Sequence, residues 1–127
     1  MLTVPVAVPY IAKNAESYVA KALADKAISG LFGEHIDDFE RRFAEFIGVK
    51  EAVACSSGTS ALHLALAAYG IQAGDEVLVS SLTNMATFFA VIYCGAKPIP
   101  VDIDIDTYNI SVQDLKRKVT SKTKAIL

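Results

Sequence analysis

The residues best suited to bind a ligand are Ser57, Gly58 and Thr59, in a run of small residues between an apolar segment and an amphipathic one. The first turn of a helix presents unpaired backbone N–H groups and a partial positive charge, so it holds an anion without a basic side chain. Gly58 allows a ligand to approach the backbone closely, and nearby hydroxyls, including that of Ser60, add donors. The pattern predicts a phosphate site, with plain helix capping as the alternative.

The elements that position this turn alternate between helix and strand. Hydrophobic periodicity predicts helices over 15–28, 36–47, 59–69, 84–93 and 112–119, and strands over 52–55, 77–79, 98–101 and 124–127. Continuous apolar strands joined by helices indicate an α/β three-layer sandwich with a mainly parallel sheet. Ligands of such sheets bind at the carboxyl ends of strands, where the turn 56–60 is expected, so position favours the phosphate site over a simple cap.

The organisation is that of one domain over residues 1–127. A helical segment, 1–48, precedes the alternating segment, 49–127, which contains the predicted phosphate site. The length of 127 residues, 53% hydrophobic content and net charge of −2 fit a globular domain of ordinary size. The last predicted strand reaches Leu127 with no closing helix, so we expect a truncated domain.

Charge and terminal composition argue against two classes of partner. Basic residues are spread along the chain apart from 116–124, which fits a solvated helix face, so no nucleic acid is expected. The N-terminal residues 1–9 have neither a basic start nor a long apolar core, so neither a signal peptide nor a membrane-spanning helix is expected. The cytoplasm is the expected compartment.

Neither the cysteines nor the acidic run predicts a metal site. Cys55 and Cys94 lie in apolar segments without CxxC spacing, so we interpret both as buried, reduced thiols. Asp102, Asp104 and Asp106 alternate after the third predicted strand. Hard cations need more converging ligands than this run supplies, so we expect a solvated turn and no metal.

Several motifs follow one another in an order and spacing typical of one family. They occupy residues 28–30, 33–49, 52–66, 74–77 and 95–104. They resemble the DegT/StrS family of nucleotide-sugar aminotransferases over nearly the whole chain. The resemblance implies a large domain similar to that of aspartate aminotransferase (fold type I), pyridoxal 5′-phosphate (PLP) as cofactor, and a homodimer with shared active sites. It also implies transfer of an amino group, usually from glutamate, to a keto-sugar attached to a nucleotide.

The resemblance assigns roles to individual residues. Ser57, Gly58 and Thr59 match the family's cofactor-phosphate loop. Asn84 stands where the family usually carries an aromatic residue that stacks on the cofactor ring; an amide lacks that apolar face but can hydrogen-bond to ring substituents or to substrate. Ser29 matches a position near the substrate at the dimer interface, and the alternative is that it ends the first helix before Gly30.

The catalytic groups implied by the resemblance fall after Leu127. They are the lysine that binds the cofactor covalently and the acidic residue that pairs with its ring nitrogen. We therefore assign no catalytic residue here and expect the 127-residue chain alone to lack transaminase activity. One alternative is a PLP-dependent sugar dehydratase of the same family. Another is a non-catalytic phosphate- or nucleotide-binding module, although the sequence contains neither GxGxxG nor GxxxxGK[ST].

Overall fold

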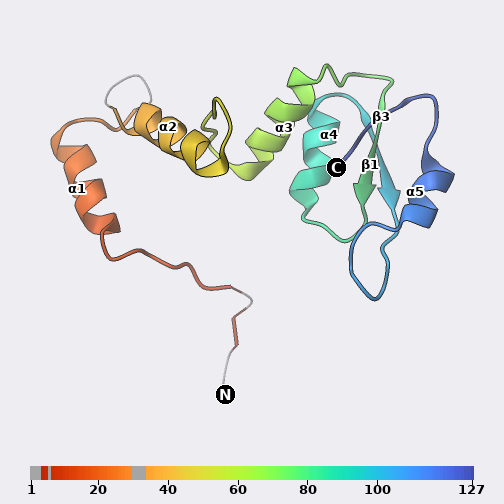
Figure 1. Cartoon of the computed structure of the whole chain (residues 1–127), viewed down its shortest axis with the longest axis horizontal. Coiled ribbons are helices and arrows are strands. Elements are labelled where there is room, and N and C mark those ends of the chain that lie inside the picture. The colour runs from red at the N-terminus through yellow and green to blue at the C-terminus, as the bar shows by residue number, and fades with distance from the viewer. Residues whose placement is uncertain (1–3, 6, 30–33) are drawn as a thin grey trace. The chain divides into compact units, whose positions relative to one another are not determined.

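The computed structural model describes residues 4–5, 7–29 and 34–127 (Figure 1). Its elements are α1 (Ala15–Ala24), α2 (His35–Ile47), α3 (Gly58–Ala68), β1 (Glu76–Ser80), α4 (Met85–Tyr93), β2 (Lys97–Val101), α5 (Val112–Lys118) and β3 (Thr123–Ile126). The chain divides into two compact units, Met1–Ala54 and Cys55–Leu127. The first contains α1 and α2, and the second contains every named strand.

The second unit is built on a parallel sheet in the order β2-β1-β3. Leu78 in the middle of β1 is in register with Ile99 of β2 and with Ile126 of β3. Figure 1 shows α4 and α5 on opposite sides of this sheet, while α3 packs against α4. The predicted fold class, a three-layer arrangement with a parallel sheet, is confirmed.

The core lies on both faces of β1, because successive strand side chains point in opposite directions. Val77 and Val79 join a cluster with Leu66 of α3 and Val91 of α4. Leu78, between them, is also fully buried. Burial on both faces explains why β1 consists of consecutive apolar residues instead of an alternating pattern.

One predicted strand does not form. In the described part of the chain, residues 52–55 belong to no strand, and the Ala54 N–H donates to Glu40 Oε1 at 2.7 Å. A strand is stable only when a neighbour takes up its backbone groups, and β1 already has β2 and β3 on its two sides. Cys55 is consequently exposed, so its predicted burial is wrong, whereas Cys94 is half-buried and packs against the core.

Helix α1 ends four residues before its predicted end. Lys26 adopts a left-handed conformation with φ of 57°, its N–H donates to Leu23 O, and the Ala27 N–H donates to Ala22 O. This is a Schellman ending, in which glycine usually supplies the left-handed residue, as Gly48 does after α2. The expectation that Ser29 ends this helix is therefore wrong, and Gly30 lies outside the described residues.

Candidate cofactor-phosphate site

The turn predicted to hold a phosphate forms the start of α3. Ser57 is the N-cap residue, with extended backbone, and its Oγ accepts a hydrogen bond from the Ser60 N–H at 3.2 Å. Gly58 and Thr59 are the first two helical residues, so their N–H groups lie in the first turn, where donors have no intrahelical acceptor. The structure thus places all three predicted phosphate-loop residues in one turn, with Ser57 and Gly58 exposed.

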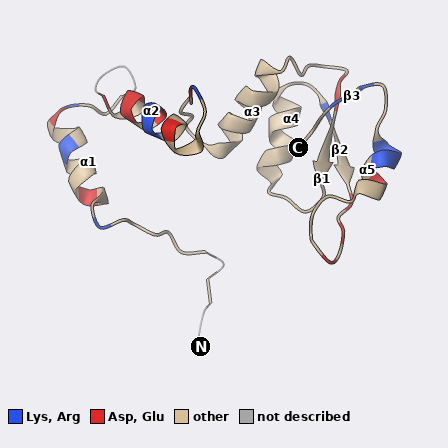
Figure 2. Cartoon of the chain, viewed as in Figure 1, with Lys and Arg blue, Asp and Glu red and all other residues tan. Residues whose placement is uncertain are grey.

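The electrostatics of this turn suit an anion. Neither α3 nor α4 carries an acidic residue in its first turn, whereas α1, α2 and α5 each do. Figure 2 shows α3 and α4 free of charged side chains along their whole lengths. The partial positive charge at the start of α3 is therefore not neutralised by a carboxylate of its own helix.

Gly58 lies at an open position of the turn. A Cβ added at this position meets no other atom within 4 Å, and its φ lies outside the left-handed region. Neither backbone strain nor packing within the chain therefore requires glycine here. The chain itself therefore leaves room beside the first turn of α3 at this residue.

Asn84 begins the next helix of the same unit. Its Oδ1 accepts a hydrogen bond from the Ala86 N–H at 2.9 Å, which makes it the N-cap of α4, and it is exposed. In Figure 1, β1 and β2 point toward the end of the unit at which α4 starts. The carboxamide oxygen is thus used for capping, and the amide NH₂ is the group that remains suited to donate to a ligand.

The remaining site residue, Ser29, belongs to the first unit. It is exposed and lies in a single-residue β-bridge after α1.

The sequence interpretation missed one residue of the turn, Ser56, whose hydroxyl lies 3.2 Å from that of Ser60. Ser56 precedes the N-cap Ser57, so helical spacing gives no signal for this contact.

The acidic run after β2 forms a turn. Asp104 Oδ1 accepts hydrogen bonds from the N–H groups of Asp106 and Thr107 and from the Thr107 hydroxyl. The bonds from Thr107 lead the effects that lower the pKa of Asp104, because they stabilise its ionised form. Within the described residues, no three His, Cys, Asp or Glu side chains are grouped so that they hold a metal ion.

A cavity of about 610 Å³ lies elsewhere in the second unit. Leu66, Tyr69 and Gln72 line it with residues of β3, so it is located at the end of α3 that is opposite to Ser57. Its lining combines apolar residues with Gln72, Asp75 and Lys124, and it includes none of Ser57, Gly58, Thr59 and Asn84. The candidate site is therefore an open helix start and not this cavity.

The fold and the turn together define a parallel α/β domain in which the start of α3 is a candidate phosphate site. A family model described as the DegT/DnrJ/EryC1/StrS aminotransferase family matches residues 9–127. The chain belongs to this family. Within the described residues, no helix has the length and apolar character needed to cross a bilayer.

Individual relatives agree with the family. The chain is 46% identical to GDP-perosamine synthase of Caulobacter vibrioides over 98% of its own length and 33% of that protein. It superposes on the aminotransferase from Psychrobacter cryohalolentis with a TM-score of 0.87 and 36% identity, covering 93% of this chain and 30% of that one. It also superposes on the Escherichia coli GDP-4-keto-6-deoxy-D-mannose-3-dehydratase with bound hydrated PLP, with a TM-score of 0.85 and 32% identity. This match covers 99% of this chain and 33% of the dehydratase chain. The chain thus spans about a third of the length of these relatives.

Proposed function

We propose that the chain forms the cofactor-phosphate part of a PLP-dependent aminotransferase that acts on a nucleotide-linked keto-sugar, with glutamate as amino donor. The observation that carries the proposal is the start of α3: an exposed turn with a hydroxyl cap, no acidic residue and open space in front of Gly58. The family supports the reaction class, and a relative named GDP-perosamine synthase supports a nucleotide-sugar substrate.

Each proposed site residue has a separate task. The N–H groups of Gly58 and Thr59 donate to the cofactor phosphate, and Ser57 fixes the turn by capping it. The Asn84 amide donates toward the ring or substrate while its oxygen holds the start of α4. Ser29 contributes to substrate binding at an interface between two copies of the protein. When bound, PLP supplies the electron sink that amino-group chemistry requires.

A dehydratase is the second candidate. It is favoured by the likeness to the dehydratase structure with bound hydrated PLP, which covers 99% of this chain. Both reactions use the same cofactor, and the phosphate turn serves either one. The two are distinguished by the fate of the amino group. With glutamate and a keto-sugar nucleotide, an aminotransferase releases 2-oxoglutarate and an amino sugar, whereas a dehydratase that takes its two electrons from glutamate releases 2-oxoglutarate, ammonia and a deoxy-sugar. This measurement is made on the complete product of the gene that encodes this chain.

The phosphate site itself is tested by two substitutions at one position. Gly58→Ala and Gly58→Val fill the space in front of the turn, and we expect both to weaken binding of PLP and of inorganic phosphate, Val more than Ala. Because Ala has fewer unfolded conformations than Gly and φ at position 58 is not left-handed, Gly58→Ala is expected to keep or raise the melting temperature while it lowers affinity. Titrations followed by ³¹P NMR measure the affinity. Equal affinity in the parent and both variants would mean that the turn is only a cap.

A further inference from the structure

The two sides of β2 differ in the backbone groups that they present. Within the described residues, β2 is an edge strand that pairs with β1 on one side. The Lys97 N–H, at the start of β2, donates to Asp75 O at 2.9 Å. Val101 O, at its end, accepts from the Ser81 N–H at 2.8 Å. Both ends of β2 therefore direct their backbone groups toward β1 and the residues that flank it.

The residues between these ends include two prolines that face the other way. Backbone groups alternate between the two sides of a paired strand, so Pro98 and Pro100 lie on the outer side. Proline has no N–H. Between Lys97 and Val101, the outer side of β2 consequently carries no backbone donor. The edge strand at the opposite end of the sheet, β3, contains no proline.

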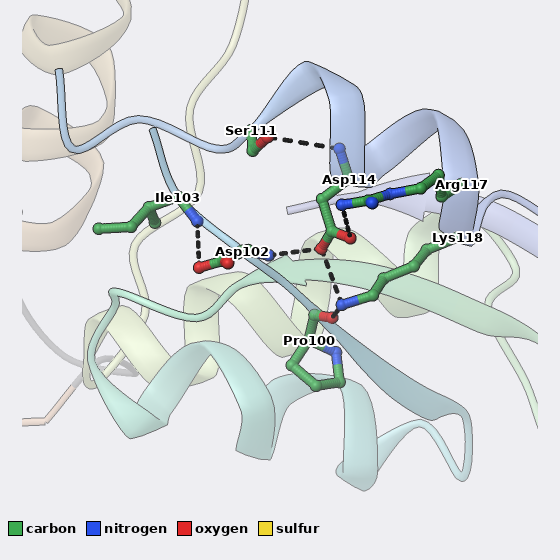
Figure 3. A network of polar contacts seen from close by, with 7 residues as sticks. All are labelled: Pro100, Asp102, Ile103, Ser111, Asp114, Arg117 and Lys118. Atoms are coloured by element: carbon green, nitrogen blue, oxygen red, sulfur yellow. Dashed lines mark hydrogen bonds and ion pairs between the residues drawn. The ribbon is translucent and has the colours of Figure 1, made fainter. Parts of the chain in front are cut away.

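Groups of α5 and its N-cap take up the next backbone groups on the outer side. Pro100 O accepts a hydrogen bond from Lys118 Nζ at 2.7 Å (Figure 3). Directly after β2, the Asp102 N–H donates to Asp114 Oδ2 at 2.8 Å, and Asp102 O accepts from the Ser111 N–H at 2.8 Å. A strand that adds to an edge needs donors and acceptors in regular succession. Here the donors are missing or occupied, and so are two of the acceptors.

We propose that Pro98, Pro100 and the side chains of α5 close the outer edge of β2 to strand addition. An open edge pairs with the edges of other chains because its N–H and C=O groups have no partners. Prolines are tolerated at such an edge because an outward N–H contributes nothing to the sheet. The device protects the second unit from edge-to-edge association through β2, and it is independent of the phosphate site.

Restoring the two donors tests the proposal. Pro98→Thr/Pro100→Thr introduces two N–H groups on a polar residue that favours strands. At high concentration of the 127-residue chain, we expect sedimentation equilibrium to give this variant a larger average mass than the parent, approaching about twice its value when two open edges pair. Hydrogen exchange of the new amides at positions 98 and 100 is expected to slow as the concentration rises. Association through other surfaces is common to both proteins, so the comparison isolates β2.

Two further variants separate the backbone from the side chains. Pro98→Val/Pro100→Val restores the same N–H groups with apolar side chains, so its association is expected to match that of the Thr variant. Adding Lys118→Met to the Thr variant uncovers the carbonyl of residue 100 and is expected to move association to lower concentration. Pro98→Thr and Pro100→Thr are also measured singly, since each restores one donor with a smaller change to the strand.

The chain contains a matched control for the loss of two prolines. Its other prolines, Pro5 and Pro9, lie in the N-terminal segment outside the named helices and strands. Pro5→Thr/Pro9→Thr makes the same change in composition without altering the sheet. Its average mass is expected to equal that of the parent at every concentration.

Three outcomes would overturn the proposal. The first is an equal mass in the parent and in the folded single and double Thr variants, because the restored donors would then recruit no strand. The second is association of the Val variant without the Thr variant, which would assign the effect to apolar side chains. The third is equal association in the Pro5→Thr/Pro9→Thr control, which would make it independent of β2. No further association on adding Lys118→Met would remove α5 from the device.

Discussion

The carboxylate of Asp114 accepts a hydrogen bond from the backbone N–H of Asp102 at 2.8 Å, which attaches the first turn of α5 to the end of β2 (Figure 3). The same carboxylate is paired with Lys118 at 2.8 Å and with Arg117 at 3.1 Å. Lys118 also donates to Pro100 O at 2.7 Å, within β2. Asp114 therefore joins helix, strand and turn through a single side chain that is 10% exposed.

This network predicts a pH-dependent stability. The Asp102 N–H first, and then Lys118, lower the pKa of Asp114 below its ordinary value of 3.8. A carboxylate whose pKa is lower in the folded state than in the unfolded state stabilises the fold at pH values above the unfolded-state pKa. That stabilisation is lost as the pH falls through the folded-state pKa. Asp114→Asn is therefore expected to be less stable than the parent at pH 7, and the deficit should shrink as the pH falls through 3.8 and below.

Urea unfolding at a series of pH values measures this effect. Asp37→Asn is the control, because it removes a carboxylate from the exposed surface of α2, outside the network. A deficit in Asp114→Asn that stays constant from pH 7 to below 3.8 would show that the ionised form contributes nothing specific.

The ending of α1 predicts a stabilising substitution. Lys26 occupies the left-handed position of its Schellman ending with φ of 57°, which costs a residue with a Cβ about 1 kcal/mol relative to glycine. Lys26→Gly is expected to slow amide hydrogen exchange in the last turn of α1. The reverse change, Gly48→Ala after α2, is expected to speed amide exchange in the last turn of α2. Gly48 has a φ of 79°, a left-handed conformation that is strained for a residue with a Cβ. Equal exchange rates in Lys26→Gly and the parent would contradict the strain.

The connection between α2 and residues 50–54 predicts another measurable effect. Glu40 Oε1 accepts the Ala54 N–H at 2.7 Å, fourteen residues away. Glu40→Ala leaves that N–H without its acceptor, so exchange of the Ala54 amide should be faster by about tenfold, equivalent to about 1.4 kcal/mol. Glu40→Gln keeps an acceptor and is expected to retain most of the protection. If Glu40→Ala and the parent exchange Ala54 equally fast, the bond does not contribute.

Most of the second unit was predictable, and the exceptions have physical reasons. Strand β1 and helix α4 are apolar runs bounded by turn residues, and local pattern sufficed to place them within two residues. Residues 52–55 are equally apolar, but strand formation depends on a distant partner that local pattern does not report. Lys26 carries no sequence signal for a left-handed conformation. The hydroxyl contacts of Ser60 depend on side-chain rotamers, which the sequence leaves open.

Asn84 allows its two roles to be measured separately. Its Oδ1 caps α4, and its amide NH₂ is the proposed donor to the cofactor or substrate. Asn84→Ser keeps a capping oxygen but removes the amide, so it should retain stability and bind PLP more weakly, while its affinity for inorganic phosphate is unchanged. Asn84→Ala removes both and should lose about 1 kcal/mol as well. Equal PLP affinity in Asn84→Ser and the parent would restrict Asn84 to capping, because only the amide distinguishes the two proteins.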